Sequence, residues 1–329
     1  MITSKELAVI CNVSRGTVDR ALNGKPGINE QTRKRILEAS EQYGYRPDIT
    51  ARSLVKKQTM SLGIVIFDLN NTFFAQLLNA MEAKAREKGY FLFITLTNKR
   101  VDLEEECLDH LAGRRVDGII LSSVHPTSGY AEFLKKLETP VLALLNKVDD
   151  SVPFIGMNDH DAMFDATNYV ISKGYQRLIY VSPPLAQEDK TNIYAQSQRR
   201  DGFLAAVKAY AGELDSEIIG RKGYVEKLME YSFSRDCKTA IICSSDYFAI
   251  NVLNSLRMRG IHVPYDVGVM GFDSISLLKF FDPTLSTVAS NIEAMASLAV
   301  ERVLELIAGR EVPRETNMSY QIVPGQSII

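Results

Sequence analysis

Apolar runs and helical segments alternate along most of the chain. From Ser61 onward the apolar runs are SLGIVIF, YFLFITL, VDGIILSS, PVLALLN, RLIYVSP, KTAIICSS and DVGVMGF. Segments with a helical period, such as Ala75–Lys88 and Asp246–Arg259, lie between them. Short continuous apolar strands that alternate with helices indicate parallel sheets covered by helices on both faces. The pattern supplies enough strands for two such sheets, and it predicts an α/β body with two lobes.

Two segments are predicted to carry the chain from one lobe to the other, namely Phe154–Asp161 and Val288–Asn291. The expected lobe 1 holds about residues 61–158 and 290–318, and lobe 2 holds about residues 159–289 and 319–329. Open parallel sheets bind ligands beyond the carboxyl ends of their strands. We therefore expect a ligand-binding cleft between the lobes.

Several residues fall at the predicted strand ends that would face this cleft. They are Asp68, Asn70, Phe73, Phe74, Ser245, Asp246 and Asp273, and Arg199 opens a helix after a polar loop. Other roles remain open for some of them, because Phe73 and Phe74 can be core residues, Asp246 a helix N-cap and Arg199 a surface charge. We favour a ligand role for Asp273 and Arg199 and a capping role for Asp246.

The N-terminal residues predict a first helix over Ser4–Cys11. Thr3 and Glu6 have the spacing of a capping box, in which the two residues cap each other's backbone N–H groups. Asn12 tolerates the left-handed conformation that ends many helices. The apolar residues of this helix are Leu7, Ala8, Ile10 and Cys11.

Two further helices follow, over Arg15–Leu22 behind the N-cap Ser14 and from Asn29 to about Tyr43, before Gly44. Expected to face inward are Val18, Ala21, Leu22, Ile36 and Leu37, and expected to face outward are Arg33, Lys34 and Arg35. The short gap between the first two helices is typical of a helix-turn-helix, whose second helix lies in the major groove of DNA. A small helical bundle with a solvated basic face is the alternative.

Charge separates this N-terminal part from the rest of the chain. Residues 1–60 contain 11 Lys or Arg and 6 Asp or Glu, a net charge of +5, whereas the remaining residues contain 27 and 34, a net charge of −7. A basic segment on an acidic body favours contact with an anion such as DNA through that segment. We therefore prefer the helix-turn-helix interpretation.

Composition and motifs exclude several classes of protein. The chain is 46% hydrophobic and 24% charged, which is ordinary for a globular protein. It has neither an apolar export signal nor an apolar run of membrane-spanning length, so we expect a cytoplasmic location with no membrane partner. Its cysteines, Cys11, Cys107, Cys237 and Cys243, lack the C-x-x-C spacing and are expected to be buried thiols.

No catalytic motif is present in the sequence. It lacks G-x-S-x-G, G-x-x-x-x-G-K-[ST] and G-x-G-x-x-G, and its histidines, His110, His125, His160 and His262, are too far apart for a metal pair on one helix face. We expect no enzymatic activity, no cofactor and no metal site.

The motifs SRGTVDRALNG, INEQTRKRI, YGYRPDITARSL and VGVMGFD occur in this order. In sequence and spacing they resemble those of the LacI/GalR family of transcription regulators, and the resemblance covers essentially the whole chain. It implies an N-terminal helix-turn-helix domain, residues 1–46, a hinge helix or linker, residues 47–60, and an effector-binding and dimerisation domain, residues 61–329. The last of these has the two-lobed type I fold shared with periplasmic sugar-binding proteins.

The resemblance also implies which residues contact DNA. Arg15 and Gly16 occupy base-contacting positions at the start of the recognition helix, and Arg20 faces the groove. Asp19 stands where the family commonly has Ser, and a carboxylate there is unfavourable beside phosphates unless Arg15 or Arg20 pairs with it. The residues expected to contact DNA are Thr3, Ser14, Arg15, Gly16, Thr17, Arg20, Asn23, Arg52, Leu54, Lys56 and Lys57.

Residues 47–57 form a segment too short to be a stable helix alone in water. By resemblance it folds on DNA and pairs across a dimer, and Leu54 enters the minor groove at the central base step. Lys56 and Lys57 would neutralise neighbouring phosphates. Asp48 replaces the Asn that is usual in the family, and Leu54 could instead dock on the body.

For the cleft, the resemblance implies a sugar-like ligand. Phe73 or Phe74 would stack on the ring, while Arg199 and Asp273 would bond its hydroxyl groups. Ser245 stands where the family often has Asn, and Asn158 and Asp159 stand where it often has Asp and Asn. The expected effector-binding residues are Asp68, Asn70, Phe73, Phe74, Asn158, Asp159, Arg199, Ser245 and Asp273.

These features predict a DNA-binding transcription regulator, in particular a repressor, controlled by a small sugar or sugar derivative. The expected partners are a pseudo-palindromic double-stranded operator and a second copy of the chain, because one helix-turn-helix matches one half-site. The strand-like SYQIV near Ile329 is followed by no heptad tail, which favours dimers. A sugar-binding transport protein and, third, a sugar-modifying enzyme are the alternatives.

Overall fold

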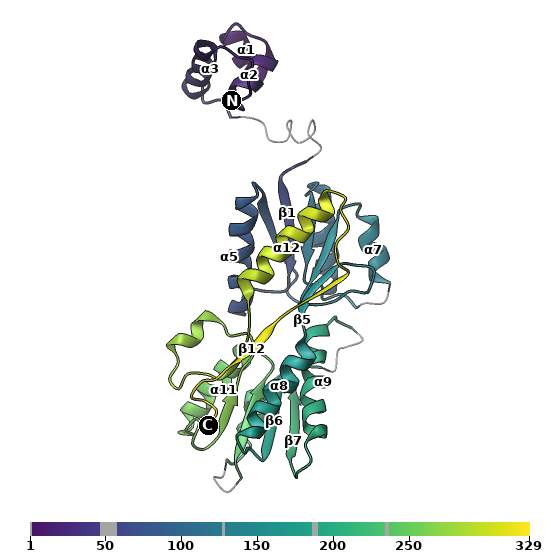
Figure 1. The fold of residues 1–329 in the computed structure, drawn as a ribbon, viewed down its shortest axis with the longest axis vertical. Coiled ribbons are helices and arrows are strands. Elements are labelled where there is room, and N and C mark those ends of the chain that lie inside the picture. The colour runs from purple at the N-terminus through teal and green to yellow at the C-terminus, as the bar shows by residue number, and fades with distance from the viewer. Residues whose placement is uncertain (1, 47–57, 127–128, 186–189, 234–236) are drawn as a thin grey trace. The chain divides into compact units, whose positions relative to one another are not determined.

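The computed structural model describes residues 2–46, 58–126, 129–185, 190–233 and 237–329 (Figure 1). The chain divides into two compact units, Met1–Thr59 and Met60–Ile329. Residues 2–46 of the first are called the N-terminal unit below, and Met60–Ile329 is called the body.

The N-terminal unit consists of α1 (Ser4–Ile10), α2 (Arg15–Leu22) and α3 (Glu30–Gln42). The predicted capping box between Thr3 and Glu6 is confirmed, and Ser14 and Asn29 cap α2 and α3 as predicted. Asn12 has the expected left-handed conformation, with φ of 49°. The core of the unit contains Leu7, Ala8, Cys11, Val18, Ala21, Ile36 and Ala39.

Two predicted orientations in this unit are wrong. Leu37 is 45% exposed, because the helix period of α3 turns Ile36, but not Leu37, to the core. Arg33 does not point outward, since it is half-buried and its Nη2 donates a hydrogen bond to the carbonyl oxygen of Lys25 at 2.8 Å. Arg33 thereby ties the loop between α2 and α3 to α3.

Lobe 1 of the body is built on a parallel sheet with the strand order β11-β5-β4-β3-β1-β2. Its strands are β1 (Ser61–Ile66), β2 (Phe91–Leu96), β3 (Gly118–Leu121), β4 (Val141–Leu144), β5 (Phe154–Met157) and β11 (Glu315–Met318). The helices α5 (Thr72–Glu87) and α12 (Ile292–Ile307) lie side by side on one face (Figure 1). The helices α6 (Val101–Gly113) and α7 (Tyr130–Lys136) cover the other face.

Lobe 2 repeats this arrangement on a second parallel sheet, with the order β7-β6-β8-β9. Its strands are β6 (Arg177–Ser182), β7 (Asp215–Gly220), β8 (Thr239–Cys243) and β9 (Gly268–Met270). The helices α8 (Asp159–Ser172) and α9 (Tyr194–Ala209) cover one face, and α10 (Tyr224–Leu228) and α11 (Asp246–Met258) cover the other. A short 3-10 helix, η1 (Ser276–Phe280), follows β9. The predicted α/β fold with two parallel sheets is confirmed.

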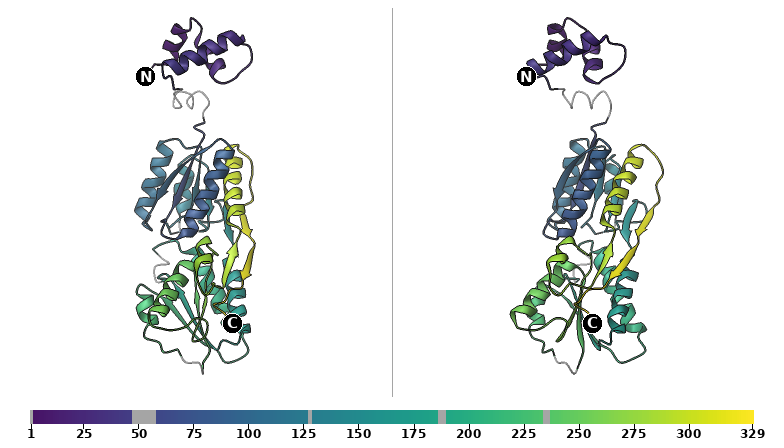
Figure 2. Two further views of the ribbon diagram at one scale, coloured as in Figure 1. Left: turned by 90° about the vertical axis from the view of Figure 1, so that its left-hand side faces the viewer. Right: turned by 60° about the vertical axis from the view of Figure 1, so that its left-hand side comes forward.

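The segments between the lobes differ in detail from the predicted ones. Phe154–Met157 is a strand of the lobe 1 sheet, so the first change of lobe falls just before α8. Further along, β10 (Thr287–Ser290) pairs in antiparallel fashion with β12 (Tyr320–Val323). Figure 2 shows these two strands between the lobes, where the chain crosses again from one lobe to the other.

An unusually close contact between α8 and α9 fixes the geometry of lobe 2. A Cβ atom at Gly202 of α9 would lie 2.1 Å from the backbone oxygen of His160 in α8. Only glycine therefore lets the two helices approach to this distance. This packing brings Arg199, one turn before Gly202, next to Asp159 at the start of α8.

The remaining expectations concern cysteines and membrane segments. Cys11 and Cys243 are buried as predicted, whereas Cys107 and Cys237 are half-buried. All are free thiols. Within the described ranges, the helices are too short or too polar to cross a membrane, and no cluster of His, Cys, Asp or Glu side chains there has the arrangement of a metal site.

Candidate DNA-binding and effector-binding sites

The start of α2 presents a polar, exposed surface. The Ser14 hydroxyl accepts a hydrogen bond from the backbone N–H of Thr17 at 3.2 Å and lies 3.0 Å from the Thr17 hydroxyl. Arg15 and Arg20 are exposed on the same helix. The caps thus fix the helix end and leave Arg15 free to extend from it.

Gly16 has no packing reason to be glycine. The nearest atom to a Cβ built there would be the Ser14 hydroxyl, at 3.7 Å, which is an ordinary contact. Glycine within a helix costs roughly 0.5–1 kcal/mol relative to alanine. Its presence therefore fits a surface that another molecule approaches closely.

Asp19 has partners that the sequence did not indicate. Its carboxylate pairs with Lys25 at 2.9 Å and accepts a hydrogen bond from the Asn23 amide at 2.7 Å. Lys25 thus offsets the charge of Asp19, in place of the expected Arg15 or Arg20. Asn23, predicted to contact DNA, is engaged in this cluster, and Thr3 is engaged in the capping box. Asp48, Arg52, Leu54, Lys56 and Lys57 lie outside the described residues.

A buried ion-pair network lies at the carboxyl end of the lobe 2 sheet, with Arg199 at its centre. The Arg199 Nε donates to Asp159 at 2.7 Å, and its Nη1 donates to the Ser244 carbonyl oxygen at 2.6 Å and to Asp273 at 3.3 Å. The guanidinium also stacks over the Phe272 ring, 3.7 Å from its centroid. Of the predicted effector-binding residues, Asp159, Arg199 and Asp273 are therefore brought together.

The preferred capping role of Asp246 is wrong. The N-cap of α11 is Ser245, which makes no side-chain capping bond, and Asp246 is fully buried. Its carboxylate accepts hydrogen bonds from the backbone N–H of Ile275 at 2.9 Å and from the Thr287 hydroxyl at 2.7 Å. Asp246 therefore connects the end of β8 to the loop after β9 and to β10.

Burial perturbs the carboxylates of this network. Loss of solvation raises the pKa of Asp246, and the nearby charge of Asp273 raises it further. Burial likewise raises the pKa of Asp273, although the adjacent Arg199 opposes this effect. Burial also raises the pKa of Asp159. Such perturbed groups gather at functional sites more often than elsewhere.

Asp273 also has an unusual backbone conformation, with φ of 112°. Non-glycine residues in such regions cost on the order of 1–3 kcal/mol and are common at ligand sites. The side chain of Asn71, the N-cap of α5 in lobe 1, lies close enough to the Asp273 carboxyl group to lower its pKa. The network therefore reaches both lobes.

The other predicted effector residues play mainly local roles in the structure. Asp68 accepts the backbone N–H of Asn70 at 2.9 Å and pairs with Lys99. Asn158 caps α8. Phe73 and Phe74 are each 6% exposed and belong to the core. Their stacking on a ligand stays a prediction, and the rings offer little exposed surface for it.

Sequence reasoning missed a second polar cluster between the lobes. Asn192, just before α9, donates its backbone N–H to the Val124 oxygen at 2.8 Å and its side-chain amide to the Lys147 oxygen at 2.9 Å. The amide of Asn146, after β4, bonds the Ser123 oxygen at 2.9 Å and the Asn192 oxygen at 3.3 Å. Asn146 is the last residue of the apolar run PVLALLN and Asn192 lies in the polar loop before Arg199, and no motif distinguishes either of them.

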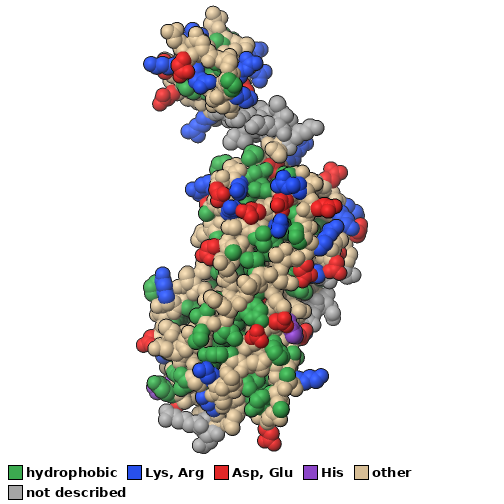
Figure 3. Space-filling model, viewed as in Figure 1, with side chains coloured by type: hydrophobic (Ala, Val, Ile, Leu, Met, Phe, Trp, Pro, Cys, Tyr) green, Lys and Arg blue, Asp and Glu red, His purple; other side chains and the backbone are tan. Residues whose placement is uncertain are grey.

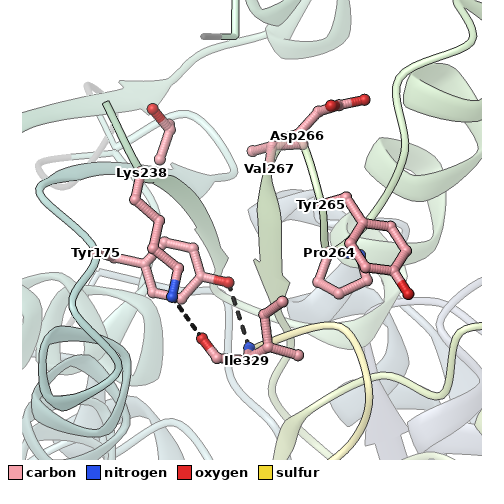
Figure 4. A pocket seen from close by; sticks show the side chains of 8 residues that line it. Tyr175, Lys238, Pro264, Tyr265, Asp266, Val267 and Ile329 are labelled. Carbon is pink, nitrogen blue, oxygen red and sulfur yellow. Dashed lines mark hydrogen bonds between the residues drawn. The ribbon is translucent and has the colours of Figure 1, made fainter. Parts of the chain in front are cut away.

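The close-up in Figure 4 shows a different place, a small cavity at the opposite end of the lobe 2 strands. It measures about 210 Å³ and includes Tyr175, Lys238 and Ile329 in its lining. The Lys238 amine donates to the Ile329 oxygen at 2.7 Å and lies over the Tyr175 ring at 4.5 Å. These contacts secure the last residues to lobe 2.

The chain combines a helix-turn-helix unit with a two-lobed body (Figure 3) that has polar clusters between its lobes. This combination defines a class of ligand-responsive DNA-binding proteins. The family described as "Bacterial regulatory proteins, lacI family" matches residues 3–48, and a periplasmic binding protein-like domain matches residues 167–328. The chain belongs to the lacI family of DNA-binding transcription regulators, which are not enzymes. The predicted family and regulator class are thereby confirmed.

Individual relatives agree with this assignment. Catabolite control protein A of Priestia megaterium is 31% identical over 304 residues, covering 91% of this chain and 90% of the relative. The lac repressor dimer bound to operator and the anti-inducer ONPF has the same fold, with a TM-score of 0.85, 20% identity and coverage of 100% and 99% of the two chains. A complex of the regulator CelR with cellobiose has a TM-score of 0.70, 21% identity and coverage of 99% and 100%.

Proposed function

We propose that the protein is a repressor that binds a pseudo-palindromic operator as a homodimer and changes its affinity for that operator when a small sugar-like effector binds between the lobes. The observation that carries the proposal is the occurrence, in one chain, of a helix-turn-helix and a buried polar network at the carboxyl ends of parallel strands. Residues 47–60 would link the DNA-binding domain to the effector domain.

The effector part of this proposal rests on Arg199, Asp159 and Asp273. Charged groups with little solvent around them form strong, directional hydrogen bonds with hydroxyl groups. The contact between Asn71 and Asp273 gives a ligand a means to act on both lobes. A ligand changes DNA affinity only if it binds two lobe arrangements unequally.

A sugar screen by thermal shift tests the effector proposal. A sugar that binds the folded body raises its apparent melting temperature, and it should then change the affinity of the full chain for its operator. A sugar that raises the melting temperature of the protein without altering operator affinity would argue against a regulatory role of the cleft.

For DNA contact, we expect Arg15→Ala to remove the preference for one base pair in each half-site. An arginine that donates two hydrogen bonds to guanine contributes roughly 1–3 kcal/mol of discrimination. Fluorescence anisotropy with single-base variants of the operator measures this preference. Lys34→Ala on the exposed face of α3 is the control, and it should leave the order of preferred bases unchanged. An identical base preference for Arg15→Ala and the wild type would remove Arg15 from the base-contacting set.

The dimer proposal is supported by the edge strand β2. In lobe 1 it lies at the end of the sheet and exposes large apolar side chains, with Phe91 72%, Phe93 41%, Ile94 46% and Leu96 36% exposed. A row of exposed apolar side chains on a free sheet edge favours association with another chain. A second copy of the chain is the proposed partner, as in the lac repressor dimer.

We expect Phe91→Glu to weaken self-association at least tenfold, because a charge would be buried in an apolar contact. Sedimentation equilibrium measures the dissociation constant. Met258→Glu, at a residue 79% exposed on lobe 2, is the matched control and should leave it unchanged. Equal effects of the two substitutions would contradict a β2 interface.

A further inference from the structure

The network around Arg199 contains more carboxyl groups than basic groups, and burial raises the pKa of each carboxyl group. Asp159, Asp246 and Asp273 are each at most 6% exposed, and Arg199 is 7% exposed. In the described part of the chain, Arg199 is the one Lys or Arg that is buried. A ligand that enters this site therefore meets one guanidinium that is already paired with two carboxyl groups, those of Asp159 and Asp273.

The positive charge of Arg199 is already engaged before any ligand arrives. Its Nε faces Asp159 at 2.7 Å, its Nη1 faces Asp273 at 3.3 Å, and the flat face of the guanidinium rests on Phe272. Arginine is an effective partner for phosphate and carboxylate when its donors are unoccupied. Here Asp159 and Asp273 already accept from the guanidinium, and an anionic ligand would have to compete with both carboxyl groups for its donors.

Two neutral hydroxyl groups beside the network lack hydrogen-bond partners among the described residues. The hydroxyl of Ser244, whose carbonyl oxygen accepts from Arg199, is fully buried and makes no hydrogen bond to any described residue. The Tyr180 hydroxyl is likewise buried without a partner among those residues, and it is close enough to Arg199 and Asp159 to experience their charges. Burial raises the pKa of Tyr180, so this hydroxyl stays neutral. An unpaired buried hydroxyl is costly unless a ligand or water bonds it.

We propose that Asp159 is a specificity-determining residue, which neutralises Arg199 and makes the cleft select an uncharged, hydroxyl-rich ligand over a phosphorylated or carboxylated one. The inference rests on the proposed function of the cleft as a sugar site. An amide at position 159 would leave the charge of Arg199 less compensated.

Matched sugar pairs test the proposal without knowledge of the natural effector. The probes are glucose with glucose 6-phosphate and glucuronate, galactose with galacturonate, and ribose with ribose 5-phosphate. Binding to the full chain is measured by thermal shift and calorimetry. The protein variants are Asp159→Asn and, as a control that removes one exposed carboxylate from α6 of lobe 1, Asp109→Asn.

The wild type should bind a neutral member at least tenfold more tightly than its anionic partners, since one unpaired charge at a few ångströms costs that much even at an effective dielectric constant of about 20. Asp159→Asn should reduce this ratio about tenfold, and Asp109→Asn should not. The wild-type ratio alone can overturn the proposal, so it does not depend on the variant being folded.

An anionic sugar that binds the wild type as tightly as its neutral partner would overturn the charge selection and leave the sugar site intact. An unchanged ratio in a folded Asp159→Asn variant would overturn the role of Asp159. The absence of binding by every probe, in wild type and variants alike, would count against the proposed sugar site itself and against the inference that rests on it.

Discussion

Replacement of Arg199 by Met is expected to lower the free energy of unfolding of the body by roughly 3–5 kcal/mol, because loss of one partner leaves buried charges uncompensated. The stranded carboxylates are Asp159 and Asp273, whose bonds to the guanidinium are 2.7 Å and 3.3 Å long. Urea unfolding followed by far-ultraviolet circular dichroism measures the change. This expectation differs from that for an exposed ligand-binding arginine, whose loss would affect only ligand affinity.

The deficit of Arg199→Met should also depend on pH. Burial holds the pKa of Asp159 and Asp273 above the unfolded values, and removal of Arg199 takes away the group that opposes this rise. A carboxyl group with a raised folded-state pKa binds more protons in the folded state, so stability falls as the pH rises above the unfolded pKa of about 4. The deficit should therefore be larger at pH 8 than at pH 5.

Arg257→Met on the exposed side of α11 is the control for this substitution. Surface substitutions of this kind change stability by about 0.5 kcal/mol or less. A deficit for Arg199→Met that is equally small, or that is the same at both pH values, would contradict the description of Arg199 as the centre of a buried charge network.

Gly202→Ala should have the second large effect. The new Cβ would lie 2.1 Å from the backbone oxygen of His160, so α8 and α9 must separate. Overpacking typically costs roughly 1–3 kcal/mol, and a backbone obstacle allows little relief. Because Asp159 and Arg199 lie on these two helices, sugar binding should weaken along with stability, as measured by urea unfolding and calorimetry on the same sample.

Gly113→Ala provides the matched control, because no atom lies within 4 Å of a Cβ at Gly113, the last residue of α6. It should be neutral or slightly stabilising. If Gly202→Ala were tolerated as well as Gly113→Ala, the close packing of α8 on α9 could not be what positions Arg199.

Local signals in the sequence account for the parts of the fold that could be predicted. The caps at Thr3, Ser14 and Asn29 involve residues at most three positions apart, and each is found where the sequence placed it. The buried strands β1 and β8 are continuous apolar runs. Strands with little apolar character escaped prediction, such as β11 with the sequence ETNM and the exposed start of β7.

The site could be predicted only in part, because its key contacts join distant positions. Asp246 follows a strand and precedes a helix, which is the local pattern of an N-cap, yet its partners are Ile275 and Thr287. The pairing of Asp19 with Lys25 depends on the course of the loop after α2. No periodicity along the chain encodes such contacts. Asp273 follows a strand, as predicted, whereas Arg199 lies within α9 and does not open a helix, so its predicted placement is wrong.

The central claim, sequence-specific DNA binding by a dimer, is tested most directly by selecting DNA from a random pool with the full chain and sequencing the bound fraction. The account predicts one enriched site with two half-sites related by a two-fold axis, bound by two chains, and loss of one base preference per half-site with Arg15→Ala. Recovery of DNA with no shared sequence, or of an unrepeated site bound by a single chain, would contradict it.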